Sequence, residues 1–157
     1  MLRELMVIHG ATAPTQYKAS AKTNTGCPVV VNYATGTFQA PTEETVDNLF
    51  FVDKERYATG VYAGITNLSD YEDQFNVVDK NACGKLCAYD YAGDVFATSE
   101  YDTESITEDA VGKRVAAVNG KLAVATKASK YQFAGFVTDN GHTLAKIVVC
   151  DSAVANA

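Results

Sequence analysis

Short runs in which apolar and polar residues alternate follow one another along most of the chain, and no helical pattern is long enough to form a core helix. In the stretch 28–36, PVVVNYATG, the side chains of Val29, Val31 and Tyr33 share one face, as in a β-strand. Pro28 is tolerated there because it stands at the strand's first position. Further strand-like runs lie at 48–53, 56–66, 74–79, 85–93, 94–98, 113–126, 131–138 and 142–150. Short strands joined by turn residues predict an all-β fold, either a small barrel or a sandwich.

Two turns between these runs have a recognisable chemistry. Asn119 and Gly120 separate two apolar runs, and both residues tolerate positive φ, so they predict a two-residue type I′ hairpin. Asp139, Asn140 and Gly141 separate the last two runs, and they predict a three-residue link with a bulged turn closed by the glycine. Ser105 and Glu108 have the spacing of a capping box and predict one helical turn over 105–112.

Residues 1–27 show neither the strand nor the helix period. A short apolar start is followed by Thr, Ala, Ser and Lys, which predicts an extended N-terminal arm that becomes ordered against a partner. The rest is then one β-rich domain, 28–150, with its compact part at about 45–150, and a C-terminal tail, 151–157. The apolar side chains of the arm are candidate partner contacts: Leu2, Leu5, Met6, Val7 and Ile8.

The charge of the chain argues against nucleic acid as a partner. The formal net charge is −6 over 157 residues, so a phosphate backbone would be repelled over most of the surface. No apolar run approaches the length of a membrane span, and the first residues do not have the pattern of a secretory signal. We therefore expect a protein that is made in a cytoplasm and that binds neither nucleic acid nor a membrane.

Cys83 and Cys87 raise the question of a metal or redox site. On a strand their side chains share a face but lie about 13 Å apart, too far for one ion or one disulfide unless Gly84 bends the chain. Zinc and thioredoxin-like sites use a closer C-x-x-C spacing, and the other cysteines, Cys27 and Cys150, stand alone. We expect four structural thiols, no cofactor and no metal.

Catalysis finds little support in the sequence. The chain has two histidines, His9 and His142, and His142 with Cys83 or Cys150 is the one conceivable nucleophilic pair. The acids between 90 and 109 lack the spacing of a calcium loop, so we interpret them as solvated charge. The alternatives are weak cation binding or contacts for a basic partner surface. Glu100, Asp102 and Glu104 are the candidate contacts among them.

Four stretches taken in order resemble tailed-bacteriophage capsid accessory proteins, the decoration, cement or head-fibre subunits that sit on a capsid lattice. They are RYATGVYAGITNLSDY, AYDYAGDVFATSEYD, VGKRVAAVNGKLAVA and YQFAGFV, within about residues 45–150. The resemblance rests on turn chemistry and strand order, and it implies no active-site residue. It implies a structural protein at the outer capsid surface of the virion, made in the host cytoplasm, with the major capsid protein as its partner.

The functional hypothesis is therefore a non-enzymatic decoration or cement subunit, without catalytic residues. Placement on a symmetric lattice also favours a homo-oligomer with two-fold or three-fold symmetry. The alternatives are a small β-barrel module that binds a ligand and, with less support, a minor hydrolase that uses His142.

Overall fold

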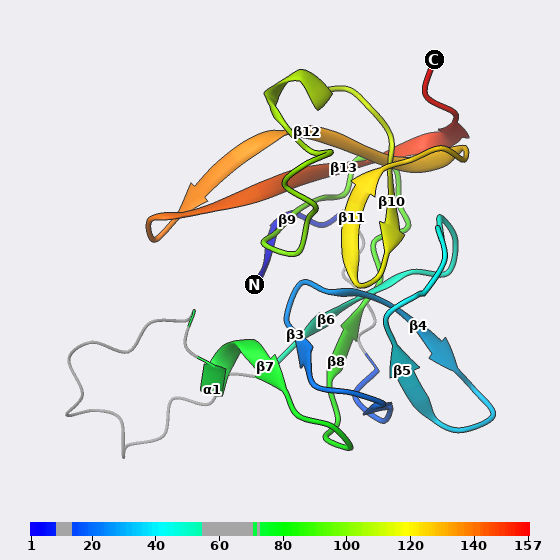
Figure 1. Cartoon of the computed structure of the whole chain (residues 1–157), viewed down its shortest axis with the longest axis vertical. Helices are drawn as coiled ribbons and strands as arrows, with labels where there is room; N and C mark the ends of the chain where they lie inside the picture. The colour runs from blue at the N-terminus through cyan, green and yellow to red at the C-terminus, as the bar shows by residue number, and fades with distance from the viewer. Residues whose placement is uncertain (9–13, 55–70, 72) are drawn as a thin grey trace.

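A four-stranded antiparallel sheet is built from strands far apart in the sequence. The computed structural model describes residues 1–8, 14–54, 71 and 73–157. The order in the sheet is β1 (Leu2–Met6), β9 (Val95–Thr98), β13 (His142–Val154) and β12 (Ser129–Asp139). The β12–β13 hairpin projects well beyond its neighbours (Figure 1). The last two strands of the chain, β12 and β13, thus lie side by side in this sheet, and β1 lies at the edge opposite β12.

A second, five-stranded sheet carries most of the first half of the chain. Its order is β2 (Lys18–Ala19), β5 (Thr37–Gln39), β4 (Pro28–Asn32), β6 (Phe50–Asp53) and β8 (Lys85–Cys87). Only β2 and β5 are parallel; the other pairs in this sheet are antiparallel. Smaller elements complete the fold: β3 (Thr23–Asn24) with β7 (Val77–Val78), the hairpin of β10 (Val115–Val118) and β11 (Lys121–Val124), the helical turn α1 (Asp73–Asn76) and a 3₁₀ turn at Glu108–Ala110. The predicted all-β class is confirmed.

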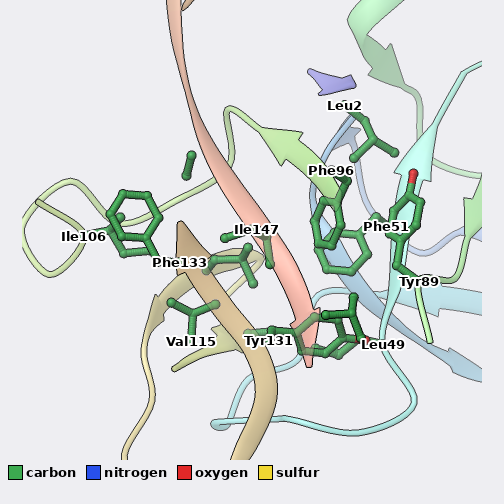
Figure 2. Close-up of a cluster of buried hydrophobic side chains, with 14 of the residues drawn as sticks. Leu2, Leu49, Phe51, Tyr89, Phe96, Ile106, Val115, Tyr131, Phe133 and Ile147 are labelled. Carbon is green, nitrogen blue, oxygen red and sulfur yellow. The ribbon is translucent and has the colours of Figure 1, made fainter. Parts of the chain in front are cut away.

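Aromatic rings join the two sheets. Phe51 of β6 packs on Phe96 of β9 with ring centroids 4.5 Å apart, and Tyr89 stacks on Phe96 at 4.4 Å (Figure 2). Tyr131 of β12 meets the Phe51 ring edge-on at 6.0 Å. All four side chains are fully buried in the largest core cluster, which also contains Leu2 and Ile147. Such rings bury large apolar areas, so this cluster holds the two sheets against each other.

Strand β6 separates this core from a second one. Phe51 lies in the inter-sheet cluster, whereas the neighbouring Val52 packs in another cluster with Phe38 and Leu86. Because successive strand residues point to opposite faces, a strand buried on both sides needs a continuous apolar run. The sequence LFFV at 49–52 is such a run.

Both predicted hairpins form, but one turn differs from expectation. Asn119 and Gly120 have φ of +49° and +77°, and Val118 pairs with Lys121, so the two-residue turn is confirmed. The three-residue link predicted at 139–141 is wrong, because Asp139 pairs directly with His142 across Asn140 and Gly141. Asn140 also tolerates positive φ, which lets these two residues close the turn alone. The register shifts of this hairpin fall instead between Ser129 and Tyr131 and between Phe133 and Phe136, where Gly135 has φ of +97°.

The expectation of a separate arm over residues 1–27 is corrected, because β1, β2 and β3 lie in this segment and pair with strands elsewhere in the chain. Met1 is fully buried, Leu2 lies in the inter-sheet core, and β1 pairs with β9. Strands β2 and β3 use residues 18–19 and 23–24, and β4 and β5 bring the compact part well before residue 45. A register shift between Glu4 and Met6 breaks the alternation that would have indicated a strand.

Three further expectations change. The tail at 151–157 is partly ordered: β13 runs to Val154, and the Asn156 amide donates to the carbonyls of Arg114 (2.9 Å) and Ala125 (2.8 Å). The capping box does not form, because the Ser105 hydroxyl accepts from the Val124 amide and the 3₁₀ turn begins without a side-chain cap. The strand expected at 74–79 is divided between α1 and β7. The run predicted at 56–66, together with His9, lies outside the described residues.

Gly120 and Gly141 form a matched pair for testing the first hairpin. Both have positive φ, but a Cβ added at Gly120 would lie 2.9 Å from Cys27 Sγ, whereas nothing lies within 4 Å at Gly141. Gly141→Ala should cost about 1–2 kcal/mol of unfolding free energy from backbone strain. Gly120→Ala should cost about 1–3 kcal/mol more, because Cys27 must shift. Denaturant titration of both variants measures the difference, and equal losses would show that the turn is not packed against Cys27.

Candidate functional site

Strand β1 lies at an edge of the four-stranded sheet and presents apolar side chains to solvent. Leu2 points into the core, and Val7 packs against it partly buried. Leu5, Met6 and Ile8 are 48%, 52% and 51% exposed, respectively. The register shift between Glu4 and Met6 helps explain why the adjacent Leu5 and Met6 are both exposed. The candidate contacts of the N-terminal segment thus divide into two that hold it in the fold and three that face outward.

A buried carboxylate attaches this segment to a neighbouring turn. Asp94, almost fully buried, accepts a hydrogen bond from the Ile8 amide at 2.9 Å and another from the Tyr91 amide at 3.3 Å. Ile8 also lies over Gly93, where an added Cβ would come within 2.7 Å of Ile8 Cδ1. Tyr91 is 55% exposed on the same turn. We call Leu5, Met6, Ile8 and Tyr91 the apolar edge.

The charged residues of β1 make side-chain contacts that fix its position. Arg3 Nε donates to Asp139 Oδ2 at 2.6 Å, on the β12–β13 hairpin, and the Tyr89 hydroxyl donates to Glu4 at 3.1 Å. Burial is the largest cause of a raised Tyr89 pKa, and the nearby Cys87 and Glu4 add to it, so this hydroxyl stays a donor at physiological pH. The strand is therefore oriented by core, hairpin and hydrogen bonds together.

The three candidate acids have different surroundings. Glu100 is half-buried and accepts hydrogen bonds from Asn24 and Ser99, both at 3.3 Å. Asp102 accepts hydrogen bonds from the amides of Glu104 and Ser105. The Ser105 side chain is the largest cause of a lowered Asp102 pKa, and the two amides lower it further. Glu104 is exposed. Asp102 thus shapes its own loop, and of the three only Glu104 has an exposed side chain.

The groups considered for catalysis have other contacts. The His142 ring stacks on Tyr71 with centroids 3.7 Å apart, and the Tyr71 hydroxyl donates to Asp139 at 3.0 Å. The Cys150 thiol donates to Gln132, and Cys83 is exposed. Among the described residues no cluster of His, Cys, Asp and Glu could hold a metal ion. No helix in the described ranges is long and apolar enough to cross a membrane.

Sequence reasoning found Leu5, Met6 and Ile8 but did not assign Gly93 and Asp94 to the site, and it left open whether Tyr91 is a core or an interface residue. An aspartate directly before an apolar strand, in the order Gly-Asp-Val-Phe, is typical of a turn whose carboxylate caps backbone amides. That signal indicates the turn but does not reveal that β1 is the segment that it holds.

Comparison with known proteins finds no matching family model, no similar curated protein and no similar solved structure.

All four cysteines are free, but their surroundings predict different reactivities. Burial raises the pKa of Cys27 to about 12, with Glu100 adding to the effect, and burial raises the pKa of Cys87 to about 11. Cys83 is exposed and Cys150 half-buried. Iodoacetamide at pH 8 should therefore modify Cys83 first and leave Cys27 and Cys87 unmodified until denaturant is added, because the thiolate is the reactive form. Peptide mass spectrometry over time measures the order, and early labelling of Cys27 or Cys87 would contradict these burial assignments.

Proposed function

We propose that this protein is a non-enzymatic capsid accessory subunit that binds the outer surface of a viral major-capsid lattice through its apolar edge. The single observation that carries the proposal is an edge strand with Leu5, Met6 and Ile8 each about half exposed. An open sheet edge offers backbone hydrogen bonds to an added strand, and apolar side chains on it gain free energy when they are covered. The sequence resemblance to phage decoration proteins supplies the class of partner.

The strength of one such contact favours a lattice over a lone partner. Covering the exposed half of four side chains is worth about 1 kcal/mol each, or roughly 3–6 kcal/mol together. Association costs at least about 4 kcal/mol in lost translational and rotational freedom. The apolar edge alone would therefore bind weakly. Repeated copies, as in a two-fold or three-fold homo-oligomer on a capsid, convert weak contacts into stable attachment.

The charge of the chain supports a protein partner on the outside of the virion. With a net charge of −6, the surface is poorly suited to packaged nucleic acid. In this proposal the protein is made in the host cytoplasm and is added to assembled capsids.

The test compares two double variants with matched exposure and chemistry. Leu5→Asp with Met6→Asp places charges on the apolar edge, whereas Val111→Asp with Val154→Asp alters valines that are 51% and 48% exposed elsewhere. The gene for this protein is deleted from a phage that carries it, and capsids without the protein are purified. Each purified variant is then added to these capsids, and the bound amount is measured by co-sedimentation. The edge variant should bind at least about tenfold more weakly, because two contacts of about 1 kcal/mol are lost. The control should bind like the wild type.

Circular dichroism and thermal unfolding establish that both variants are folded. If the edge variant is folded and binds capsids like the wild type, the protein does not bind capsids through its apolar edge. A wild-type protein that binds no capsid would overturn the proposed function.

A further inference from the structure

A pocket with both polar and apolar lining lies between the β10–β11 turn and the segment 20–27. It encloses about 240 Å³ and is lined by residues 20–24 and 119–121, together with Cys27, Ala40 and Glu100. One wall thus comes from the β10–β11 turn, whose strands contribute to the inter-sheet core, and the other comes from the loop around β3. The pocket exists only because these two parts of the fold are held together.

The charges of the pocket differ from those of the whole chain. Lys22 and Lys121 contribute to its wall, and Glu100 is the one acid among the lining residues. Two cations and one anion give the lining one net positive charge, although the chain carries a net charge of −6. The charge of Lys121 also contributes to the lowered pKa of Asp102, which lies outside the lining. The side-chain amides of Asn24 and Asn119 add donors and acceptors, while Ala21, Ala40 and Cys27 supply small apolar surface. Such a lining suits an acidic group on a short aliphatic stem.

The walls are fixed before any ligand enters. The Asn119 amide donates to the Pro41 carbonyl at 2.8 Å, and the Leu122 amide donates to the Glu100 carbonyl at 3.0 Å. Gly120 packs so closely on Cys27 and Ala40 that an added Cβ would come within 2.9 Å and 3.2 Å of them. The Glu100 carboxylate is held by Asn24 and Ser99. The backbone and the Glu100 side chain are thus in place before binding, whereas the exposed side chains of Lys22 and Lys121 become ordered on binding.

The volume limits what can enter. Pockets for small-molecule ligands enclose about 300–1,000 Å³, so this one is below the usual range for a complete metabolite or cofactor. It has room for one or two side chains of a larger partner. A phosphate group is a poor occupant, because its charge of about −1.5 to −2 would lie near Glu100. A single carboxylate, balanced by two lysines, is a better match.

We propose that this pocket binds an acidic side chain, Asp or Glu, of a peptide segment on the partner protein. Lys121 and Lys22 interact with the carboxylate, Glu100 and backbone carbonyls accept from the amides of the segment, and the small apolar residues contact its stem. The identification of the capsid subunit as the carrier of that segment rests on the proposed function, whereas the chemistry of the pocket does not. The pocket would supply the specificity that the apolar edge lacks.

The first test measures the pocket directly, without a capsid. The ¹⁵N-labelled protein is titrated with acetyl-Gly-Glu-Gly-amide and, as a matched control, with acetyl-Gly-Gln-Gly-amide, and amide shifts are followed by NMR. The glutamate peptide should shift the signals of Asn24, Asn119 and Gly120 with millimolar affinity, and the glutamine peptide should not. Lys121→Gln should weaken the response roughly two- to fivefold, as expected for one exposed ion pair, while Lys113→Gln at an exposed loop lysine should not. No shift, or equal shifts with both peptides, would overturn the proposal.

The second test separates the pocket from the proposed function. Lys121→Gln and Lys113→Gln are compared for co-sedimentation with the same capsids. Weaker binding of Lys121→Gln alone would place the acidic segment on the capsid. If both variants bind capsids like the wild type, the pocket does not contribute to capsid binding, and the role proposed for the apolar edge is unaffected. Peptide shifts without any capsid binding would refute the proposed function and keep the pocket as a carboxylate site.

Discussion

The packing of the Phe51 ring against Phe96 and Tyr131 is the interaction on which the rest of the structure depends. It joins the five-stranded sheet to the four-stranded one through fully buried aromatic contacts (Figure 2). Removal of such a ring from a core costs about 3–5 kcal/mol, a large part of the total stability of a typical domain. The same strand continues into the second core through Val52, whose backbone exchanges hydrogen bonds with Gly26 and Cys27. Both the apolar edge and the pocket are therefore positioned by β6: Leu2 shares a cluster with Phe51, and Cys27 lies on the other side.

The parts of the fold that the sequence predicted are those with a strong local signal. Asn119-Gly120 closes the predicted two-residue turn, and the strand-like run at 48–53 contains β6. Strands β2, β3 and β7 have two residues each, too few to show any period. Their positions depend on partners far along the chain, as in the pairing of Lys18 with Thr37 or Thr23 with Val78. Such contacts cannot be read from local patterns.

The candidate site shows the same division. Leu5, Met6 and Ile8 stood out because a hydrophobic start has no local reason to be exposed, and their exposure agrees with a contact surface. What the sequence did not reveal is that the segment is a strand, held by Leu2 in the core and by the buried Asp94 carboxylate. This changes the mechanism that we propose. A preformed edge loses less conformational entropy on binding than a mobile arm would, so a small apolar surface can be sufficient when copies act together.

Hydrogen exchange in the segment 2–8 tests this account most directly. The free protein and the capsid-bound protein are labelled in deuterated water, and the exchange of the N-terminal peptide is measured by mass spectrometry. We expect this peptide to exchange more slowly in the free protein than a synthetic peptide of the same sequence, because β1 pairs with β9 and the Ile8 amide is bonded to Asp94. We expect further slowing on the capsid. Exchange at the rate of the synthetic peptide in the free protein, or no change on capsids that carry bound protein, would contradict this account.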